Sequence, residues 1–118
     1  MPTTLAAKRY AKALFQLSVE QGLLDTVHGE LHQVLELQQN SKEYADLASH
    51  RVITVEGRKK NIRLALEGRV NPLVLRFLLF LAEKHRHDIF ADIVGEFDGL
   101  FNEAKGILDI RVISAHPL

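Results

Sequence analysis

Hydrophobic and polar residues alternate along most of this chain with the period of an α-helix. Apolar residues recur every three or four positions, in segments that start at good capping residues and are separated by short polar connections. This spacing places the apolar side chains of each segment on one side of a helix. We therefore predict six helices, over residues 4–20, 24–39, 41–47, 55–66, 72–83 and 88–105.

The segment 71–83 is the most apolar of these and organises the others. Asn71 is a good N-cap and Pro72 a good first helical residue, so a helix should begin here. The only polar residue in its interior is Arg76, yet three apolar residues fall on the flank beside it: Leu73, Leu79 and Phe80. A helix that is apolar on every side is covered by other parts of its own chain or by another protein.

The first predicted helix also has more apolar surface than a single contact needs. One stripe consists of Ala7, Ala11, Leu14 and Ser18, and a second stripe of Ala6, Tyr10, Ala13 and Leu17. If this helix lies beside the fifth, the two flanks form a groove that can hold an amphipathic helix from a partner. The predicted walls are Tyr10, Ala13 and Leu17 on one side and Leu73, Phe77 and Phe80 on the other, with Arg76 and Lys84 on the rim.

The pattern changes from a helical period to a period of two after Gly106. Leu108, Ile110 and Val112 alternate with charged residues, as expected of a β-strand. A single strand is not stable alone, and no partner strand precedes it in the sequence. We therefore predict an all-α six-helix bundle in residues 1–106, and in residues 107–118 one orphan strand that opens a truncated second domain.

The composition is typical of a globular domain and gives no charge signal for a particular partner. The 118 residues include 15 basic and 15 acidic residues, so the chain has no general attraction to nucleic acid or anionic lipid. The chain has no cysteine, which excludes a disulfide framework and thiolate metal ligands. No run of about 18 apolar residues is present, so we expect no direct membrane insertion.

Residues that could carry chemistry are few. His28 and His32 are four apart, a spacing that can hold zinc, but Glu30 is not in the position that the metalloprotease pattern requires, and no third ligand is evident. We find no phosphate loop, dinucleotide fingerprint or nucleophile motif, and no pair of carboxylates spaced for acid–base catalysis. We therefore expect a non-catalytic protein without metal or cofactor.

Two other binding functions remain open from the residues alone. The basic stretch 58–63 could form a nucleic-acid-binding face, although it lacks interleaved aromatic residues and the chain has no net positive charge. The apolar flanks of the first and fifth helices could also bring copies of the chain together as a self-associating bundle. Salt dependence of binding would distinguish the first alternative, and sedimentation at several concentrations the second.

Three stretches of this sequence carry a recognisable pattern when taken together. The first is Ala7-Lys8-Arg9-Tyr10-Ala11-Lys12-Ala13-Leu14-Phe15. The second runs from Pro72-Leu73-Val74 to Leu81-Ala82-Glu83, and the third from Asn102-Glu103-Ala104-Lys105-Gly106 to Pro117-Leu118. From about residue 5 onward, their order and spacing resemble the family of delta subunits of F-type ATP synthase, whose mitochondrial counterpart is the oligomycin sensitivity-conferring protein.

The resemblance implies a peripheral-stalk subunit, placed on the cytoplasmic face of the cell membrane as part of the ATP synthase complex. It implies that the amino-terminal helix of an alpha subunit binds between the first and fifth helices, and that a second domain binds the b-type stalk subunits. The positions carried over from the family are Tyr10, Ala13, Phe80 and Lys84. The chain departs from the family at Lys84-His85, where the family usually has Asn-Gly, whose glycine supplies a left-handed turn residue.

Overall fold

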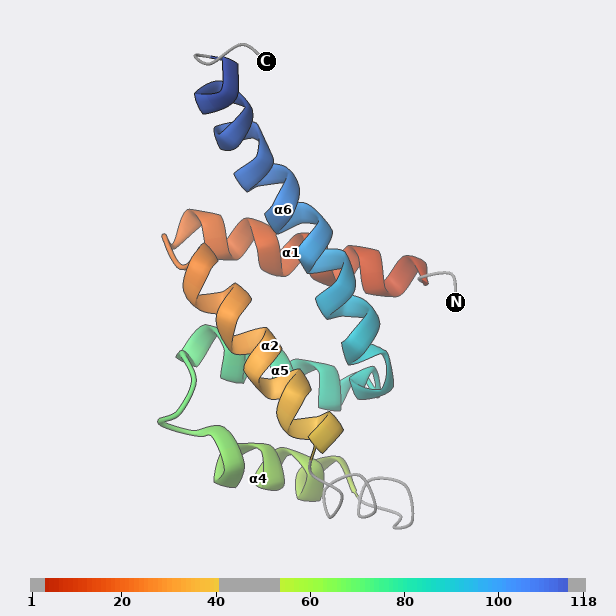
Figure 1. Cartoon of the computed structure of the whole chain (residues 1–118). Coiled ribbons are helices and arrows are strands. Elements are labelled where there is room, and N and C mark those ends of the chain that lie inside the picture. Colours follow the sequence, from red (N-terminus) through yellow and green to blue (C-terminus); the bar gives the residue numbers. More distant parts are fainter. Residues whose placement is uncertain (1–3, 41–53, 115–118) are drawn as a thin grey trace.

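The computed structural model describes residues 4–40 and 54–114. Within these ranges the chain forms five α-helices, one 3-10 helix and no strand. They are α1 (Leu5–Glu20), α2 (Leu24–Asn40), α4 (Val55–Leu66), α5 (Pro72–Glu83), η1 (His87–Ile89) and α6 (Phe90–Ser114) (Figure 1). The all-α prediction is confirmed for this part of the chain, whereas the helix predicted over 41–47 lies outside the described residues.

Three helices begin at residues whose side chains cap them, and one of these is the predicted cap Asn71. The side-chain oxygens of Thr4, Thr54 and Asn71 each accept a hydrogen bond from a backbone N–H in the first turn, at 2.9 to 3.0 Å. Such caps satisfy N–H groups that have no partner inside the helix, which fixes where each helix starts. Pro72 occupies the first turn of α5, as predicted.

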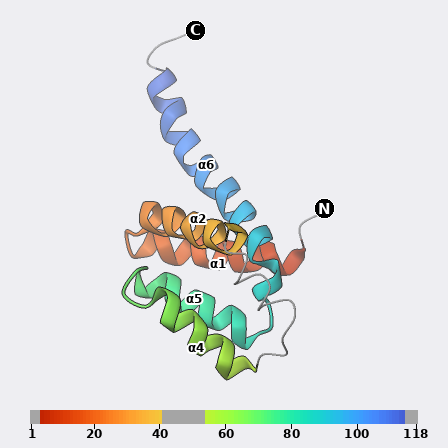
Figure 2. The ribbon, with the colours of Figure 1, turned by 60° about the horizontal axis from the view of Figure 1, so that its bottom comes forward.

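The helices are arranged as two pairs, and the long helix α6 crosses one of them. α4 lies beside α5, α1 lies beside α2, and α6 packs against both α1 and α2 (Figure 2). The core between them is formed by side chains from all five α-helices. Its largest fully buried members are Leu14, Leu31, Leu81, Phe90, Ile93 and Phe97. Of the two apolar stripes found in the sequence of α1, the one made by Ala7, Ala11, Leu14 and Ser18 faces the core, since all four residues are buried.

The strand predicted after Gly106 is wrong in the structure, because α6 continues through Gly106 as far as Ser114. The expectation that Gly106 ends the helix is also wrong. A strand needs a neighbouring strand to pair its backbone groups, and the described residues contain none. A helix pairs its own backbone groups, and one glycine in its interior costs only about 1 kcal/mol, so the helix propagates.

α6 extends well beyond the other helices at its carboxyl end (Figures 1 and 2). Its 25 residues correspond to about 37 Å of helix. Among its residues up to Gly106, whose burial the structure describes, the buried side chains lie between Phe90 and Phe97. Neither α6 nor any other helix in residues 4–40 and 54–114 combines the length and apolar character needed to cross a membrane.

Candidate partner-binding surface

The predicted site residues of α1 and α5 meet at one pair of aromatic rings. The ring centroids of Tyr10 and Phe80 are 5.9 Å apart, and their planes make an angle of 73°. This edge-to-face arrangement is favourable because the positive edge of one ring meets the negative face of the other. We call the residues around this pair the α1–α5 face; it comprises Tyr10, Ala13, Leu17, Arg76, Phe77, Phe80 and Lys84.

The α1 side of this face is open to solvent beyond Tyr10. Tyr10 is half-buried, Ala13 is exposed, and 44% of Leu17 is exposed. The three residues follow one another at the spacing of three and four that keeps side chains on one flank of a helix. Exposure alone does not identify a site, because Leu64 on α4 is exposed more fully, at 74%.

The α5 side of the face differs from the prediction at one position. Leu73 was expected on the wall of a groove, but it is only 8% exposed and belongs to the core of the chain. The reason is that two helices, α2 and α4, pack against α5. Together they cover more of the apolar surface of α5 than a single neighbouring helix would, and Leu73 is among the covered residues. Phe77 is half-buried, Arg76 is exposed, and 41% of Phe80 is exposed.

The end of α5 places Lys84 over the ring of Phe80. The Lys84 ammonium group lies 5.7 Å from the centroid of the Phe80 ring, within the range of a cation–π interaction. The helix ends at Glu83, and His85 adopts a left-handed conformation with φ of 56°. The backbone N–H of His85 donates to Ala82, and that of Arg86 donates to Leu81, which together form a Schellman motif.

His85 therefore takes the place of the glycine that the family usually has in this turn. The same motif ends α1, where Gly22 has φ of 68°. A side chain with a Cβ atom is strained in this conformation, whereas glycine is not. The helix ends at Glu83 even though the glycine that the family usually has in this turn is missing.

The basic face predicted on α4 is partly used inside the chain. Lys59 is largely buried, and its ammonium group donates a hydrogen bond to Glu83 on α5 at 2.5 Å. That hydrogen bond, together with the positive charge of Lys59, lowers the pKa of the Glu83 carboxyl below its ordinary value. Lys60 and Arg63 remain exposed, which leaves a smaller basic surface than the sequence indicated.

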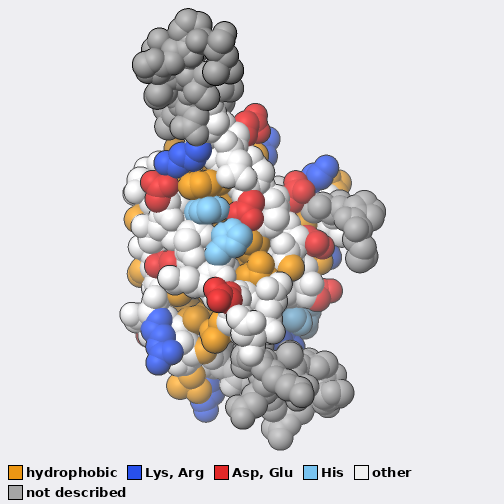
Figure 3. Space-filling model, in the orientation of Figure 1, with side chains coloured by type: hydrophobic (Ala, Val, Ile, Leu, Met, Phe, Trp, Pro, Cys, Tyr) orange, Lys and Arg blue, Asp and Glu red, His pale blue; other side chains and the backbone are white. Residues whose placement is uncertain are grey.

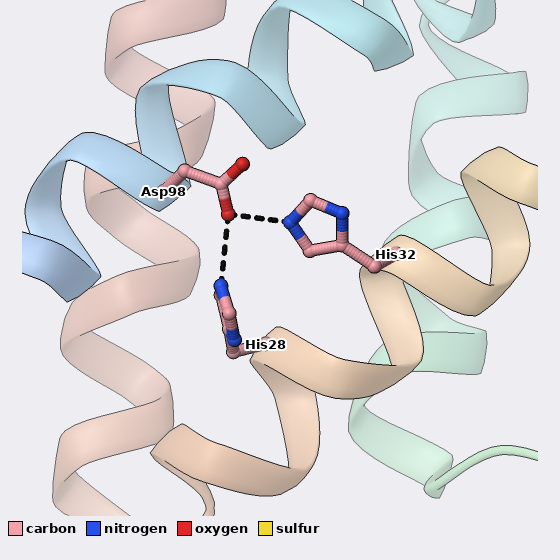
Figure 4. A group of neighbouring side chains, drawn as sticks. All are labelled: His28, His32 and Asp98. Carbon is pink, nitrogen blue, oxygen red and sulfur yellow. Dashed lines mark hydrogen bonds and ion pairs between the residues drawn. The ribbon is translucent and has the colours of Figure 1, made fainter.

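A cluster that the sequence did not reveal lies between α2 and α6. Asp98 accepts hydrogen bonds from His28 at 2.9 Å and from His32 at 2.6 Å, both on its Oδ1 atom (Figure 4). The histidine spacing was visible in the sequence, but Asp98 is 70 residues from His28 and no local pattern connects the two. The donor atoms of all three residues lie within 4.8 Å of one another, so together they could hold a metal ion.

Comparison with known proteins identifies the family. Residues 6–118 match the model of the ATP synthase delta (OSCP) subunit family. The chain belongs to this family. The resemblance that the three sequence stretches indicated is therefore confirmed, and the family model covers α1 through α6.

Several relatives in bacteria carry the name ATP synthase subunit delta. The chain is 38% identical over 112 residues to that of Symbiobacterium thermophilum, which covers 95% of this chain and 60% of the relative. It is 36% identical to the protein of Priestia megaterium, and the match covers 100% of this chain and 65% of that relative. It is 37% identical to the protein of Acetivibrio thermocellus, with 97% of this chain and 64% of that relative covered. The chain thus spans less than two thirds of the length of these relatives.

Proposed function

We propose that this chain acts as a non-catalytic stator component of an F-type ATP synthase and binds the amino-terminal helix of an alpha subunit on its α1–α5 face. Membership of the delta (OSCP) family supports the first part of the proposal. The observation that carries the second part is the edge-to-face contact of Tyr10 on α1 with Phe80 on α5. It brings together apolar flanks of the two helices that are partly exposed to solvent.

The side chains of the face suit a helix better than an extended peptide. On α1 the partner meets Tyr10, Ala13 and Leu17, which run along one flank at helical spacing. An amphipathic helix lying along this flank presents its own apolar residues at the same intervals. The small side chain of Ala13 allows the backbone of such a helix to approach closely, and Phe80 provides an aromatic anchor of the kind that dominates binding energy.

The charges on the face favour an acidic partner. Arg76 is exposed on α5, and Lys84 is exposed just after the end of α5. Apart from the Tyr10 hydroxyl, they carry the only ionisable groups among the seven residues of the face. Acidic residues flanking the apolar side of the incoming helix would pair with them. Charge pairs at the rim of an interface mainly set specificity and association rate, so we assign the affinity to the apolar residues.

The proposed role in the complex is mechanical. Rotation of the central shaft applies torque to the catalytic head, and the stator must hold the head against it from the cytoplasmic side of the membrane. Such a contact requires slow dissociation and no chemistry, which a desolvated aromatic anchor can provide. We assign the link to the b-type stalk subunits to the second domain that the family resemblance implies.

The test is a calorimetric titration of the chain with a peptide from the amino terminus of an alpha subunit. Phe80→Asp places a charge in the centre of the contact, and we expect it to weaken binding by at least about tenfold, the effect of removing one interface anchor. The matched control is Leu64→Asp, which changes an exposed leucine on α4 outside the face and should leave affinity unchanged. Circular dichroism verifies that both variants remain helical, and unchanged affinity of Phe80→Asp would contradict the proposal.

A further inference from the structure

We propose that His28, His32 and Asp98 form a binding site for a divalent transition metal ion, with Zn²⁺ the ion that fits best. The two imidazole rings come from successive turns of α2 and the carboxylate comes from α6 (Figure 4). Both Nε2 atoms converge on the Oδ1 atom of Asp98, at 2.9 and 2.6 Å. Two imidazole nitrogens and one carboxylate oxygen are a donor set that zinc accepts in proteins.

The distances require only a small rearrangement to admit the ion. Bonds of 2.0 to 2.2 Å in a tetrahedral site place neighbouring donor atoms roughly 3.4 Å apart. The hydrogen bonds of His28 and His32 to Asp98 would therefore lengthen by less than about 1 Å, with the ion taking the place of the protons that now lie between the atoms. The three donor atoms already lie within 4.8 Å of one another.

The surrounding side chains hold the cluster in position. The His28 ring stacks on Phe101 with a centroid distance of 3.7 Å and an angle of 1° between the planes. It also lies 6.3 Å from the ring of the fully buried Phe97. These contacts from α6 fix the plane of the His28 ring, so one ligand is oriented before any ion arrives, which reduces the cost of ordering the site.

The cluster is accessible from solvent. His28 and Asp98 are half-buried and His32 is exposed, and histidine side chains reach the surface on this side of the molecule beside acidic ones (Figure 3). A nearby cation does not oppose entry strongly, since Lys105, above the Phe101 ring, is paired with Asp25 at 3.1 Å. Three protein ligands leave the fourth position to water or to a group from another molecule.

An ion at this site would fasten α2 to α6. Asp98 directly follows Phe97, the last buried residue of α6 among those up to Gly106 whose burial is described. The part of α6 that follows leads away from the bundle (Figure 1). Metal binding would therefore fix the position from which the extending part of the helix leaves the domain. Because an ion that binds only the folded state stabilises it, the effect can be measured as a shift in unfolding temperature.

The test uses the untagged chain, with Zn²⁺ as the probe and Mg²⁺ as the comparison. We expect saturable binding of one Zn²⁺ per chain by calorimetry, no response to Mg²⁺, and an increase in Tm of roughly 10 °C at a hundredfold excess of free Zn²⁺ over Kd. A chelator should reverse the increase. Absence of saturable binding would mean that the three residues form only a hydrogen-bonded link between two helices, and would overturn the proposal.

Variants locate the ion. His32→Gln and Asp98→Asn each remove one donor while keeping a polar side chain of similar size, and we expect each to weaken Zn²⁺ binding by at least about tenfold. His85→Asn is the matched control, because it removes an exposed histidine outside the cluster and asparagine tolerates the left-handed conformation of that residue. Equal affinity of His32→Gln and the unchanged chain would place the ion elsewhere and overturn the proposal.

Discussion

The Tyr10 and Phe80 rings meet edge to face with their centroids 5.9 Å apart, which connects α1 to α5 at the surface of the bundle. The Lys84 ammonium group lies 5.7 Å from the centroid of the Phe80 ring, within the range of a cation–π interaction. The contact therefore belongs both to the fold and to the proposed partner-binding face. Substitutions at these positions can alter stability and affinity together, and the two effects have to be measured separately.

A double-mutant cycle on Tyr10 and Phe80 measures how much their contact contributes to the fold. We expect Tyr10→Ala and Phe80→Ala to be non-additive, with a coupling free energy of about 0.5 to 1.5 kcal/mol, the range of aromatic pairs in proteins. Urea unfolding of the four proteins gives this value directly. Additivity within about 0.3 kcal/mol would show that the rings do not interact in solution.

The left-handed conformation of His85 predicts a stabilising substitution. His85→Gly removes the steric cost of a Cβ atom at φ of 56°, and we expect it to raise the free energy of unfolding by about 1 kcal/mol. The control is Arg86→Gly, because Arg86 has φ of −111° and a glycine there relieves no strain. Glycine also raises the conformational entropy of the unfolded chain, so this variant should be less stable than the unchanged chain. Thermal unfolding measures both, and a lower Tm for His85→Gly would contradict the prediction.

Local signals in the sequence were sufficient to predict most of the helices. Thr4, Thr54 and Asn71 bond to N–H groups two or three residues away, so their effect on the helix start is visible in a short window. The end of α4 is equally local. Gly68, with φ of 81°, follows Glu67 in a type II turn whose hydrogen bond runs from Arg69 to Leu66.

Features that depend on contacts between distant residues could not be predicted in this way. The alternation after Gly106 indicated a strand, but whether a strand forms depends on a partner that the described residues do not contain. The burial of Leu73 depends on two helices packing on α5 rather than one. The meeting of His28 with Asp98 depends on how α2 and α6 cross, which no spacing within either helix specifies.

His87 gives the chain a pH dependence whose sign can be derived. Burial lowers the pKa of the His87 imidazole, and the positive charge of Arg58 lowers it further. The unfolded state therefore binds more protons below about pH 6.5, the ordinary histidine value, and the folded state loses stability as the pH falls through that region. In addition, the buried Nδ1 atom of His87 has no hydrogen-bond partner among the residues that the structure describes.

We expect His87→Leu, which replaces the partly buried imidazole with an apolar side chain, to stabilise the chain. The gain should be about 1 kcal/mol at pH 8, because an unpaired buried polar atom is removed. This gain should grow as the pH falls from 7 to 5. In the unchanged chain, folding keeps the His87 imidazole from taking up a proton, whereas the variant has no imidazole and does not carry this cost. Comparing unfolding free energies at each pH cancels the contributions of other titrating groups. A difference independent of pH would contradict the assignment to His87.

Glu30, on α2, is hydrogen-bonded to the residue that caps α5. Its Oε1 atom accepts a hydrogen bond of 2.7 Å from the backbone N–H of Asn71, and Asn71 in turn caps α5 through the N–H of Leu73. In the sequence, Glu30 stood out only as the acid between His28 and His32. Its structural partner is 41 residues away, so this role was not visible there.

Removing this carboxylate should cost more than removing an ordinary surface charge. We expect Glu30→Ala to lower the free energy of unfolding by about 1 to 3 kcal/mol, since the part-buried N–H of Asn71 loses an ionised acceptor. Glu30→Gln keeps an acceptor oxygen and should lose less. Glu36→Ala, an exposed position on the same helix, is the matched control and should stay within about 0.5 kcal/mol of the unchanged chain. If urea unfolding gave equal values for Glu30→Ala and Glu36→Ala, the hydrogen bond to Asn71 would not hold α5 in place.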